Sequence, residues 1–390
     1  MQHFDIIIVG GGIVGSAAAY YLRKHGFSGS VAIIEKDTTF QHCCTSLSAG
    51  GIRQQFSTPE NIALSTFGLN VVRNLKAEFG PEADVGFKEQ GYLILASSDG
   101  MSVLEENHHI QIAHGADNVL VKGEELAARF PWLQTEGLAS GCFGLTGEGW
   151  VDPYLFMSLF RKAAIAQDVK LLVGEVTAIS QDDRRVTAVT LSSGKTISCG
   201  VLVNAAGAGA GAVAAMAGIA LPVGPRKRYV YVFDCPAAGE AVHKAPLTVQ
   251  PGGVWFRPEG RNFICGLSPE EHEEPTVMDW EVDHGFFEER IWPALAERVP
   301  VFEAIKVVNA WVGHYDYNAL DQNAVIGPHP EIGNFYFANG YSGHGLQQGP
   351  ASGNAIAELI VHGATRTIDL ARFGYERVLR NEPLFEKNVI

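Results

Sequence analysis

The first 35 residues contain the pattern that most limits what this chain can fold into. Phe4–Val9 is a β-branched run suited to a strand buried on both faces of a parallel sheet, and it ends directly in the glycine-rich turn 10–15, with the sequence GGGIVG. A predicted helix over Ser16–His25 and a second predicted strand over Ser30–Ile34 follow, and Glu35 closes the unit. This order of strand, G-x-G-x-x-G, helix, strand and acid is typical of a βαβ unit that binds a dinucleotide.

Each residue type in this unit has a physical role. Gly10 allows the tight turn, Gly12 lets the backbone approach a pyrophosphate, and Gly15 lets the helix pack close to the strand. The N-terminus of the helix presents N–H groups and a partial positive charge to the diphosphate. Glu35 is expected to accept hydrogen bonds from the adenosine ribose hydroxyls. The unit by itself leaves open whether the dinucleotide is NAD or FAD.

Composition excludes several classes of protein. The chain has 390 residues, a formal net charge of −14 and only 18% charged residues, which indicates a large core and argues against a nucleic-acid partner. The six cysteines form no C-x-x-C pair, so we expect free thiols and no metal site. The uncharged run Ile6–Leu22 is interrupted by glycines and follows no basic residue, so we expect neither a signal peptide nor a transmembrane segment there.

The rest of the chain alternates strands, glycine-rich loops and helices. We expect a β-meander that returns to the nucleotide sheet, and later a strand, a glycine-rich loop and a long helix. A further helix is expected early in the chain, with Pro59 in its first turn, and three aromatic strands are expected in the middle of the chain. The predicted helices are 61–77 and 346–362, and the predicted strands are 169–180, 185–191, 196–204, 228–234, 253–257, 262–266 and 334–338.

Four segments in this order resemble the D-amino acid oxidase and sarcosine oxidase family of flavoproteins: Asp5–Leu22 with Glu35, Gly174–Ile179, Val201–Ala210 and Asn339–Gly353. The resemblance implies FAD as cofactor. It also implies an α/β fold, α+β overall, in which a Rossmann-type FAD domain is interleaved with an antiparallel-sheet substrate domain. The implied FAD domain comprises residues 1–86, 147–222 and 319–375, the substrate domain comprises 87–146 and 223–318, and 376–390 forms a C-terminal tail.

The resemblance also implies which residues contact FAD. Members that bind FAD covalently through a histidine carry it in the first glycine-serine loop, where this chain has Ser48, so we predict noncovalent FAD. The implied cofactor-binding residues are Gly10, Gly12, Ile13, Val14, Gly15, Glu35, Lys36, Ser46, Ser48, Ala49, Gly50, Gly51, Val176, Ala206, Gly207, Gly313, Ser342, Gly343, His344, Gly345, Leu346 and Gln347.

Two substrate anchors that are usual in the family are replaced in this chain. His314 stands where several members have an arginine for the substrate carboxylate, and Gln347 stands where monomeric sarcosine oxidases have a lysine. Arg53 and Arg228 are the remaining candidates, since a guanidinium suits bidentate carboxylate binding, although either could instead be structural or contact the flavin. His344 is a candidate catalytic residue or a supporting histidine. The candidate pocket-lining residues are Tyr229, Trp255, Arg257 and Tyr315.

The predicted reaction is hydride transfer from the carbon next to a neutral amine to flavin N5, giving an imine that hydrolyses. The predicted substrate is a secondary amine or an N-alkyl amino acid, and the acceptor is oxygen, a quinone or an electron-transfer partner. A 2-hydroxy acid dehydrogenase is one alternative. The second alternative is a flavin-containing assembly factor, because Gly50–Ile62 and Trp311–Pro330 are similar to a family member known to assemble respiratory complex I, which implies a respiratory-complex partner.

The chain shows no Arg-rich, acidic-poor presequence, so we expect a bacterial cytoplasmic protein, at the inner membrane or away from it, or a processed form in the mitochondrial matrix.

Overall fold

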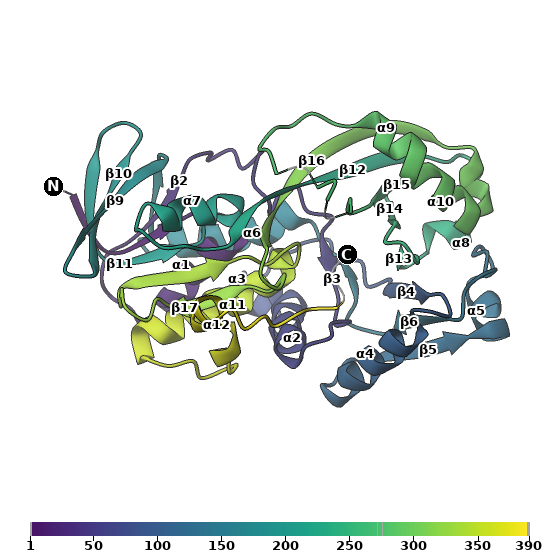
Figure 1. Cartoon of the computed structure of the whole chain (residues 1–390), viewed down its shortest axis with the longest axis horizontal. Helices are drawn as coiled ribbons and strands as arrows, with labels where there is room; N and C mark the ends of the chain where they lie inside the picture. Colours follow the sequence, from purple (N-terminus) through teal and green to yellow (C-terminus); the bar gives the residue numbers. More distant parts are fainter. Residues whose placement is uncertain (1, 271, 275, 388–390) are drawn as a thin grey trace.

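The structure, a computed structural model, describes residues 2–270, 272–274 and 276–387, and its framework is two eight-stranded sheets joined by long strands (Figure 1). The first sheet has the strand order β17-β18-β11-β1-β2-β8, with β10 and β9 added beside β11. Neighbours from β18 to β8 are parallel. Its strands are β1 (Gln2–Val9), β2 (Val31–Glu35), β8 (Lys170–Val173), β9 (Val176–Asp182), β10 (Arg185–Leu191), β11 (Thr196–Asn204), β17 (Val325–Pro328) and β18 (Phe335–Asn339).

The parallel part of this sheet brings the ends of distant strands to one edge. Strands β1, β11 and β18 are paired so that Val9, Asn204 and Phe337 lie side by side. The glycine-rich loops that follow these strands therefore meet at the carboxyl edge, which is where open α/β sheets bind their ligands.

The second sheet has the order β16-β12-β15-β14-β13-β4-β6-β5. It is antiparallel except where β13 pairs with β4 in parallel, because these two strands come from distant segments and are not joined by a hairpin. Its strands are β4 (Tyr92–Ala96), β5 (Asn118–Lys122), β6 (Ser140–Gly144), β12 (Val223–Asp234), β13 (Leu247–Val249), β14 (Trp255–Glu259), β15 (Asn262–Gly266) and β16 (Lys306–Asn318).

One edge of the second sheet is a long ribbon that extends toward the first sheet (Figure 1), and a short ladder lies between the two sheets. Strands β12 and β16 pair from Val223 opposite Asn318 to Asp234 opposite Lys306. The ladder consists of β3 (Gly51–Ile52) and β7 (Gly149–Trp150). The strands of the second sheet fall within 92–144 and 223–318, inside the stretches assigned to the substrate domain, and the domain boundaries themselves stay a prediction.

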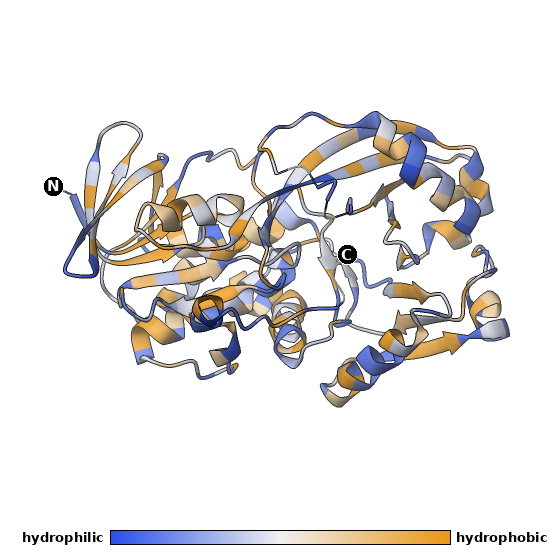
Figure 2. Ribbon diagram, in the orientation of Figure 1, coloured by the Kyte–Doolittle hydropathy of each residue, from blue (hydrophilic) through white to orange (hydrophobic). Residues whose placement is uncertain are grey.

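Helices cover both sheets, and Figure 2 shows hydrophilic and hydrophobic residues together on the peripheral helices α4 and α10. The helices of the first part are α1 (Ile13–Lys24), α2 (Pro59–Arg73), α3 (Leu75–Phe79), α6 (Pro153–Ile165), α7 (Ala210–Ala215), α11 (Gly345–His362) and α12 (Glu376–Arg380). Those of the second part are α4 (Met101–Ala113), α5 (Gly123–Arg129), α8 (Glu240–His243), α9 (His284–Phe286) and α10 (Trp292–Arg298). No helix in the described part of the chain combines the length and apolar character needed to cross a membrane.

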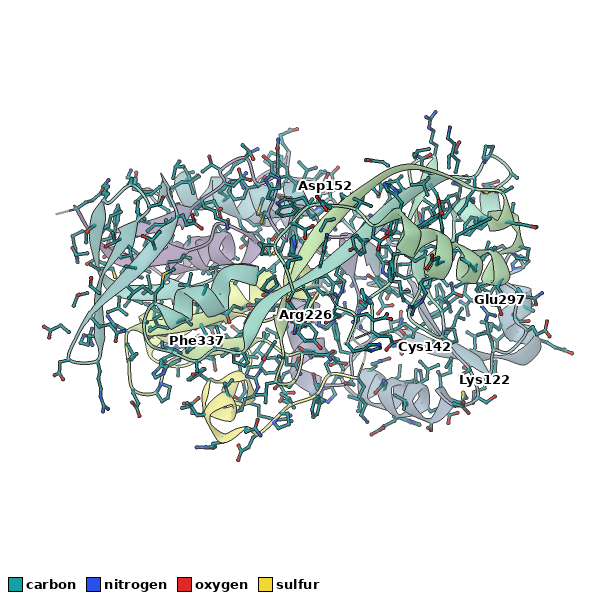
Figure 3. All side chains as sticks on the ribbon, turned by 45° about the horizontal axis from the view of Figure 1, so that its top comes forward. Lys122, Cys142, Asp152, Arg226, Glu297 and Phe337 are labelled. Atoms are coloured by element: carbon teal, nitrogen blue, oxygen red, sulfur yellow. The ribbon has the colours of Figure 1, made fainter. Side chains whose placement is uncertain are left out.

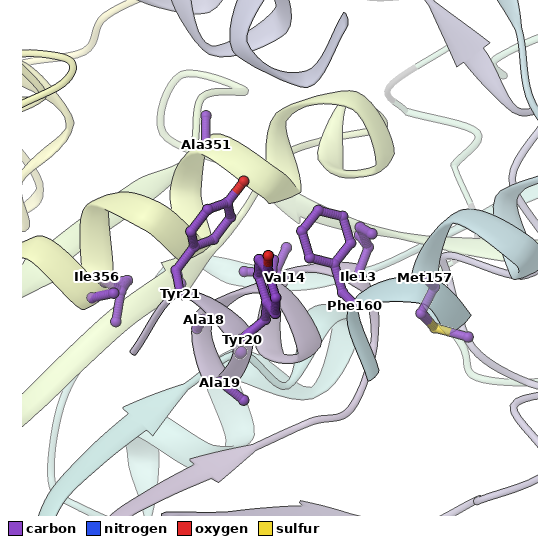
Figure 4. Packing of buried hydrophobic residues seen from close by; sticks show 14 of the residues in the cluster. Ile13, Val14, Ala18, Ala19, Tyr20, Tyr21, Met157, Phe160, Ala351 and Ile356 are labelled. Carbon is purple, nitrogen blue, oxygen red and sulfur yellow. The ribbon is translucent and has the colours of Figure 1, made fainter. Parts of the chain in front are cut away.

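The largest core cluster fixes α1 against α11 and α6. Figure 4 shows Tyr20 and Tyr21 of α1 beside Phe160 of α6, and the rings of Tyr20 and Phe160 lie 5.6 Å apart. Helix α11 approaches α1 closely, since a Cβ on Gly353 would lie 2.5 Å from the backbone nitrogen of Ala18. This packing holds the first turns of α1 and α11 at the same edge of the first sheet.

Two predicted elements differ from the structure. The predicted strand 169–180 is divided at Gly174, because β8 pairs with β2 whereas β9 turns away to pair with β10. The predicted helix 61–77 is two helices, α2 and α3, separated at Asn74, whose φ of −114° and ψ of 20° lie outside the helical region. Residues 388–390 of the predicted tail lie outside the described residues.

Candidate functional site

A continuous cavity lies where the glycine-rich loops meet the second sheet. Most of the predicted site residues line it. From the loops after β1, β2 and β11, and from the segment 48–51, these are Gly10, Gly12, Ile13, Val14, Glu35, Lys36, Ser48, Ala49, Gly51, Ala206 and Gly207. From the segment after β3, the second sheet and the start of α11, they are Arg53, Arg228, Tyr229, Trp255, Gly313, His314, Tyr315, Gly343, His344, Gly345, Leu346 and Gln347.

The backbone around α1 forms a cradle that side chains would fill. Gly10 has φ +102°, and a Cβ there would lie 2.2 Å from Ala205 O. A Cβ on Gly15 would lie 2.0 Å from Gly10 O, so this contact requires glycine as well. Helix α1 begins without a side-chain cap and without an acidic residue in its first turn, which leaves its positive end available to an anion.

Polar groups beside the cradle are arranged for a ligand. The Glu35 carboxylate is held by the N–H groups of Gly11, at 2.7 Å, and Asp37, at 2.9 Å. The Ser46 hydroxyl is buried with no hydrogen-bond partner among the described residues, although its neighbours Thr45 and Leu47 line the cavity. Of these groups it is the Glu35 carboxylate that lines the cavity, so its two hydrogen bonds hold it in position for a ligand.

The loop before α11 is held by a carboxylate that sequence analysis missed. Asp316 Oδ2 accepts N–H groups from Gly340, at 2.8 Å, and Tyr341, at 3.2 Å. Burial raises the pKa of Asp316 to about 6, and the two N–H groups oppose that rise. Asp316 lies two residues after His314 on the same strand, so strand alternation alone could have placed both on the face that carries the site.

Arg53 is buried in a cage of aromatic and polar groups. Its guanidinium stacks on the Phe56 ring at 4.0 Å, donates to Gln55 O, and donates from Nη2 to His344 Nε2 at 3.1 Å. Burial, together with the Arg53 charge, holds the pKa of His344 well below its ordinary value. His344 is therefore neutral, with Nε2 as an acceptor, and it orients Arg53.

Gln347 fixes the same segment from the other side. Its Oε1 accepts the backbone N–H of Arg53 at 2.7 Å. The position that carries a lysine in monomeric sarcosine oxidases thus has a side chain here that joins the first turn of α11 to the arginine segment.

Arg228 lies on β12 and contacts both Tyr315 and an acidic loop, which is the segment after β15 that carries Glu274 and Asp279. Its guanidinium lies 4.8 Å from the Tyr315 ring centroid, Nη1 donates to Lys227 O at 3.0 Å, and Nη2 is paired with Glu274. Next to it, Trp280 packs edge-on against His314 at 4.7 Å.

A family model described as FAD dependent oxidoreductase (DAO) matches residues 5–359. The chain belongs to this family. FAD-dependent oxidoreductase domain-containing protein 1 of Xenopus laevis is 42% identical to it over 427 residues, covering 100% of this chain and 85% of that protein. Mitochondrial sarcosine dehydrogenase of Homo sapiens is 27% identical, over 92% of this chain and 40% of that protein.

The crystal structure of L-proline dehydrogenase from P. horikoshii superposes with a TM-score of 0.87 at 27% identity, covering 98% of this chain and 100% of that one. These comparisons confirm the family and the fold that the sequence predicted. The glycine cradle and the uncapped start of α1 fit the diphosphate of FAD, and the uncapped start of α11 would suit the negative charge that a reduced flavin carries.

Six predicted site residues do not line the cavity: Gly15, Ser46, Gly50, Val176, Arg257 and Ser342. Arg257 instead donates from Nε and Nη2 to Ala49 O, at 3.0 and 2.8 Å, and so holds the loop predicted to contact the flavin. Val176 is buried in the core under the first sheet, and its role in binding FAD stays a prediction.

No group of His, Cys, Asp and Glu side chains within the described ranges is arranged to hold a metal ion. All six cysteines are free thiols, as the sequence predicted. Cys43 and Cys44 line the cavity, and burial raises the pKa of the Cys44 thiol to about 12, so it is protonated at neutral pH.

Sequence analysis also missed Glu148, a buried carboxylate behind the arginine segment. Its two oxygens accept the Gln54 N–H at 2.6 Å and the Gln55 Nε2 donor at 2.8 Å. Burial raises its pKa to about 7, and these bonds and the Arg53 charge oppose that rise. Nothing in the surrounding TGEGW sequence indicates this role, because the partners are more than ninety residues away.

The Glu148 carboxyl predicts a pH dependence of stability. Because its folded-state pKa lies above the ordinary value of 4.5, the folded protein binds the proton more tightly, and stability falls as pH rises from about 4.5 through 7. We expect Glu148→Gln to remove about 3 kcal/mol of this pH dependence. Urea unfolding of both proteins at pH 5 and pH 8 measures the difference in the free energy of unfolding. If that free energy changes equally with pH in both proteins, Glu148 does not titrate in this range.

Proposed function

We propose that this protein oxidises a C–N bond of a secondary amine or N-alkyl amino acid with noncovalently bound FAD. The observation that carries the proposal is that one cavity contains both the glycine cradle and a buried arginine, Arg53, facing apolar walls. Proline and sarcosine, which name two of the similar proteins, are both secondary amines with one carboxylate. We place the activity in the bacterial cytoplasm, or in the mitochondrial matrix for a processed eukaryotic form.

Different lining residues bind the carboxylate and the apolar part of the substrate. Arg53 binds the substrate carboxylate through charge-assisted hydrogen bonds, with His344 and Gln347 holding it in place. Leu247, Trp255 and Leu267 pack against the carbon substituents. When bound, FAD supplies the acceptor for a hydride, and the imine product then hydrolyses.

The test is anaerobic mixing of the holoprotein with a panel of acids and amines, followed by flavin absorbance. We expect sarcosine-like and proline-like compounds to bleach the flavin. Bleaching only by hydroxyglutarate-like acids would show a 2-hydroxy acid dehydrogenase instead. If no compound bleaches the flavin while a respiratory-complex subunit co-purifies, the assembly-factor alternative is correct. Adding oxygen or a quinone to the reduced protein, and following the return of the flavin absorbance, identifies the electron acceptor.

Noncovalent attachment of FAD makes a separate prediction. Ser48 lines the cavity where covalent family members carry histidine, and its hydroxyl accepts the Gly50 N–H at 3.1 Å. We therefore expect acid precipitation to release the yellow chromophore into the supernatant. Colour that stays in the washed pellet would overturn the prediction.

A further inference from the structure

Two guanidinium groups approach the same part of the cavity. Arg53 and Arg228 both line it, and Tyr315 lies within electrostatic reach of both. Burial raises the pKa of Tyr315, and both arginine charges oppose the rise. A cavity with two arginines would ordinarily suit a ligand with two acidic groups.

One of the two arginines already holds a carboxylate from the chain itself. Glu274 Oε1 is paired with Arg228 Nη2, and its Oε2 accepts Arg226 Nε at 3.0 Å. The side chains of Arg228 and Glu274 are only 8% and 5% exposed, so the pair is screened little by water. Figure 3 labels Arg226 on β12, between the two parts of the molecule.

Arg228 retains one unused donor beside this pair. Its Nε–H is buried and has no hydrogen-bond partner among the described residues. Nε and Nη2 lie on the same side of a guanidinium, and together they form the fork that accepts a carboxylate side-on. Glu274 takes only one prong of that fork, so a free carboxylate in its place could take both.

We propose that Glu274 is a specificity-determining residue that fills a second carboxylate site on Arg228 and thereby excludes diacids from the cavity. The inference deepens the proposed function and rests on it. With Glu274 in place, a ligand carboxylate binds at the Arg53 end of the cavity. At the Arg228 end Glu274 already takes the Nη2 donor, so a second carboxylate finds only part of the fork. Amino acids with a single carboxylate and an apolar substituent are then the substrate class.

A neighbouring ion pair provides the matched control. Lys227 is paired with Asp279 from the same acidic loop. Neither Glu274 nor Asp279 lines the cavity, so the two pairs differ in their cations: Arg228 lines the cavity and Lys227 does not. If the ion pairs only fasten the loop, loss of either carboxylate should have the same effect on ligands. If Glu274 occupies a ligand site, Glu274→Gln should act on diacids and Asp279→Asn should not.

The experiment titrates FAD-loaded wild type, Glu274→Gln and Asp279→Asn with propionate and with succinate, following the visible flavin spectrum. We expect wild type to bind propionate more tightly than succinate. Glu274→Gln should tighten succinate by about tenfold relative to propionate, as one added charge-assisted contact would, and Asp279→Asn should keep the wild-type ratio. If Glu274→Gln loses FAD, Glu274→Asp serves in its place and should give an intermediate tightening, because its shorter side chain cannot span both arginines.

The remaining outcomes overturn the inference. The inference is wrong if wild type binds both acids equally, or if Glu274→Gln leaves the succinate affinity unchanged. It is also wrong if Asp279→Asn changes the succinate affinity as much as Glu274→Gln does, or if no variant binds succinate. Because neither acid is an amine, the titration requires no turnover. Failure of the proposed amine oxidation would therefore show only in the bleaching experiment, and failure of this inference only in the titration.

Discussion

Replacing Arg53 by lysine is expected to lower kcat/KM for a carboxylate-bearing amine by about 100-fold, mainly through a higher KM. Lysine keeps the charge but loses the planar fork, and its ammonium cannot reproduce the bonds to both Gln55 O and His344. Loss of one partner of a buried charged contact costs about 3 kcal/mol, which corresponds to this factor. Steady-state kinetics with the amine that bleaches the flavin measure the effect.

The control is the same substitution at Arg73, which is 44% exposed and paired with Glu89. An exposed ion pair of this kind contributes at most about 1 kcal/mol, so Arg73→Lys should leave kcat/KM unchanged. Equal kinetics for Arg53→Lys and wild type would show that the substrate carboxylate binds elsewhere.

Gly10→Ala is expected to abolish FAD retention. A Cβ at this position would lie 2.2 Å from a backbone oxygen that cannot move without shifting β11, and φ +102° is strained for alanine. The turn must therefore rearrange at the place where the diphosphate is expected to lie. The ratio of flavin to protein absorbance after purification and a thermal melt measure the two consequences.

Gly26→Ala separates the effect of backbone strain from the effect of the steric clash in the cradle. Gly26 has a similar φ of +83° at the end of α1, but a Cβ there would meet nothing within 4 Å. We expect this variant to lose about 1–2 kcal/mol of stability from backbone strain and to keep its FAD. Loss of FAD from both variants would mean that general destabilisation, and not the cradle, explains the effect of Gly10→Ala.

The features that sequence predicted well are those set by local chemistry. The βαβ unit through Glu35 follows from a strand pattern, a glycine spacing and an acid within 35 residues, and each of these has a local physical cause. The family resemblance rests on four segments, of which three are glycine-rich because close backbone contacts tolerate little besides glycine at such positions.

The features that sequence did not predict depend on partners far away along the chain. Arg257 is a strand arginine like Arg228, yet one holds the Ala49 carbonyl and the other lines the cavity, and only the register of the second sheet decides between them. Glu148 and Glu274 are ordinary acids in the sequence, and their roles arise because folding buries them against segments 93 and 46 residues away.

The β12–β16 ribbon has a mechanical consequence. Twelve consecutive residues of β12 pair with β16, with one irregularity near Val232, and the ladder runs from the flavin edge to the far end of the second sheet. The ladder belongs to the second sheet alone, so it keeps the wall of the cavity that carries Arg228, Gly313 and Tyr315 in one piece. Any change in the width of the cavity would then have to come from the segments that connect this wall to the first sheet.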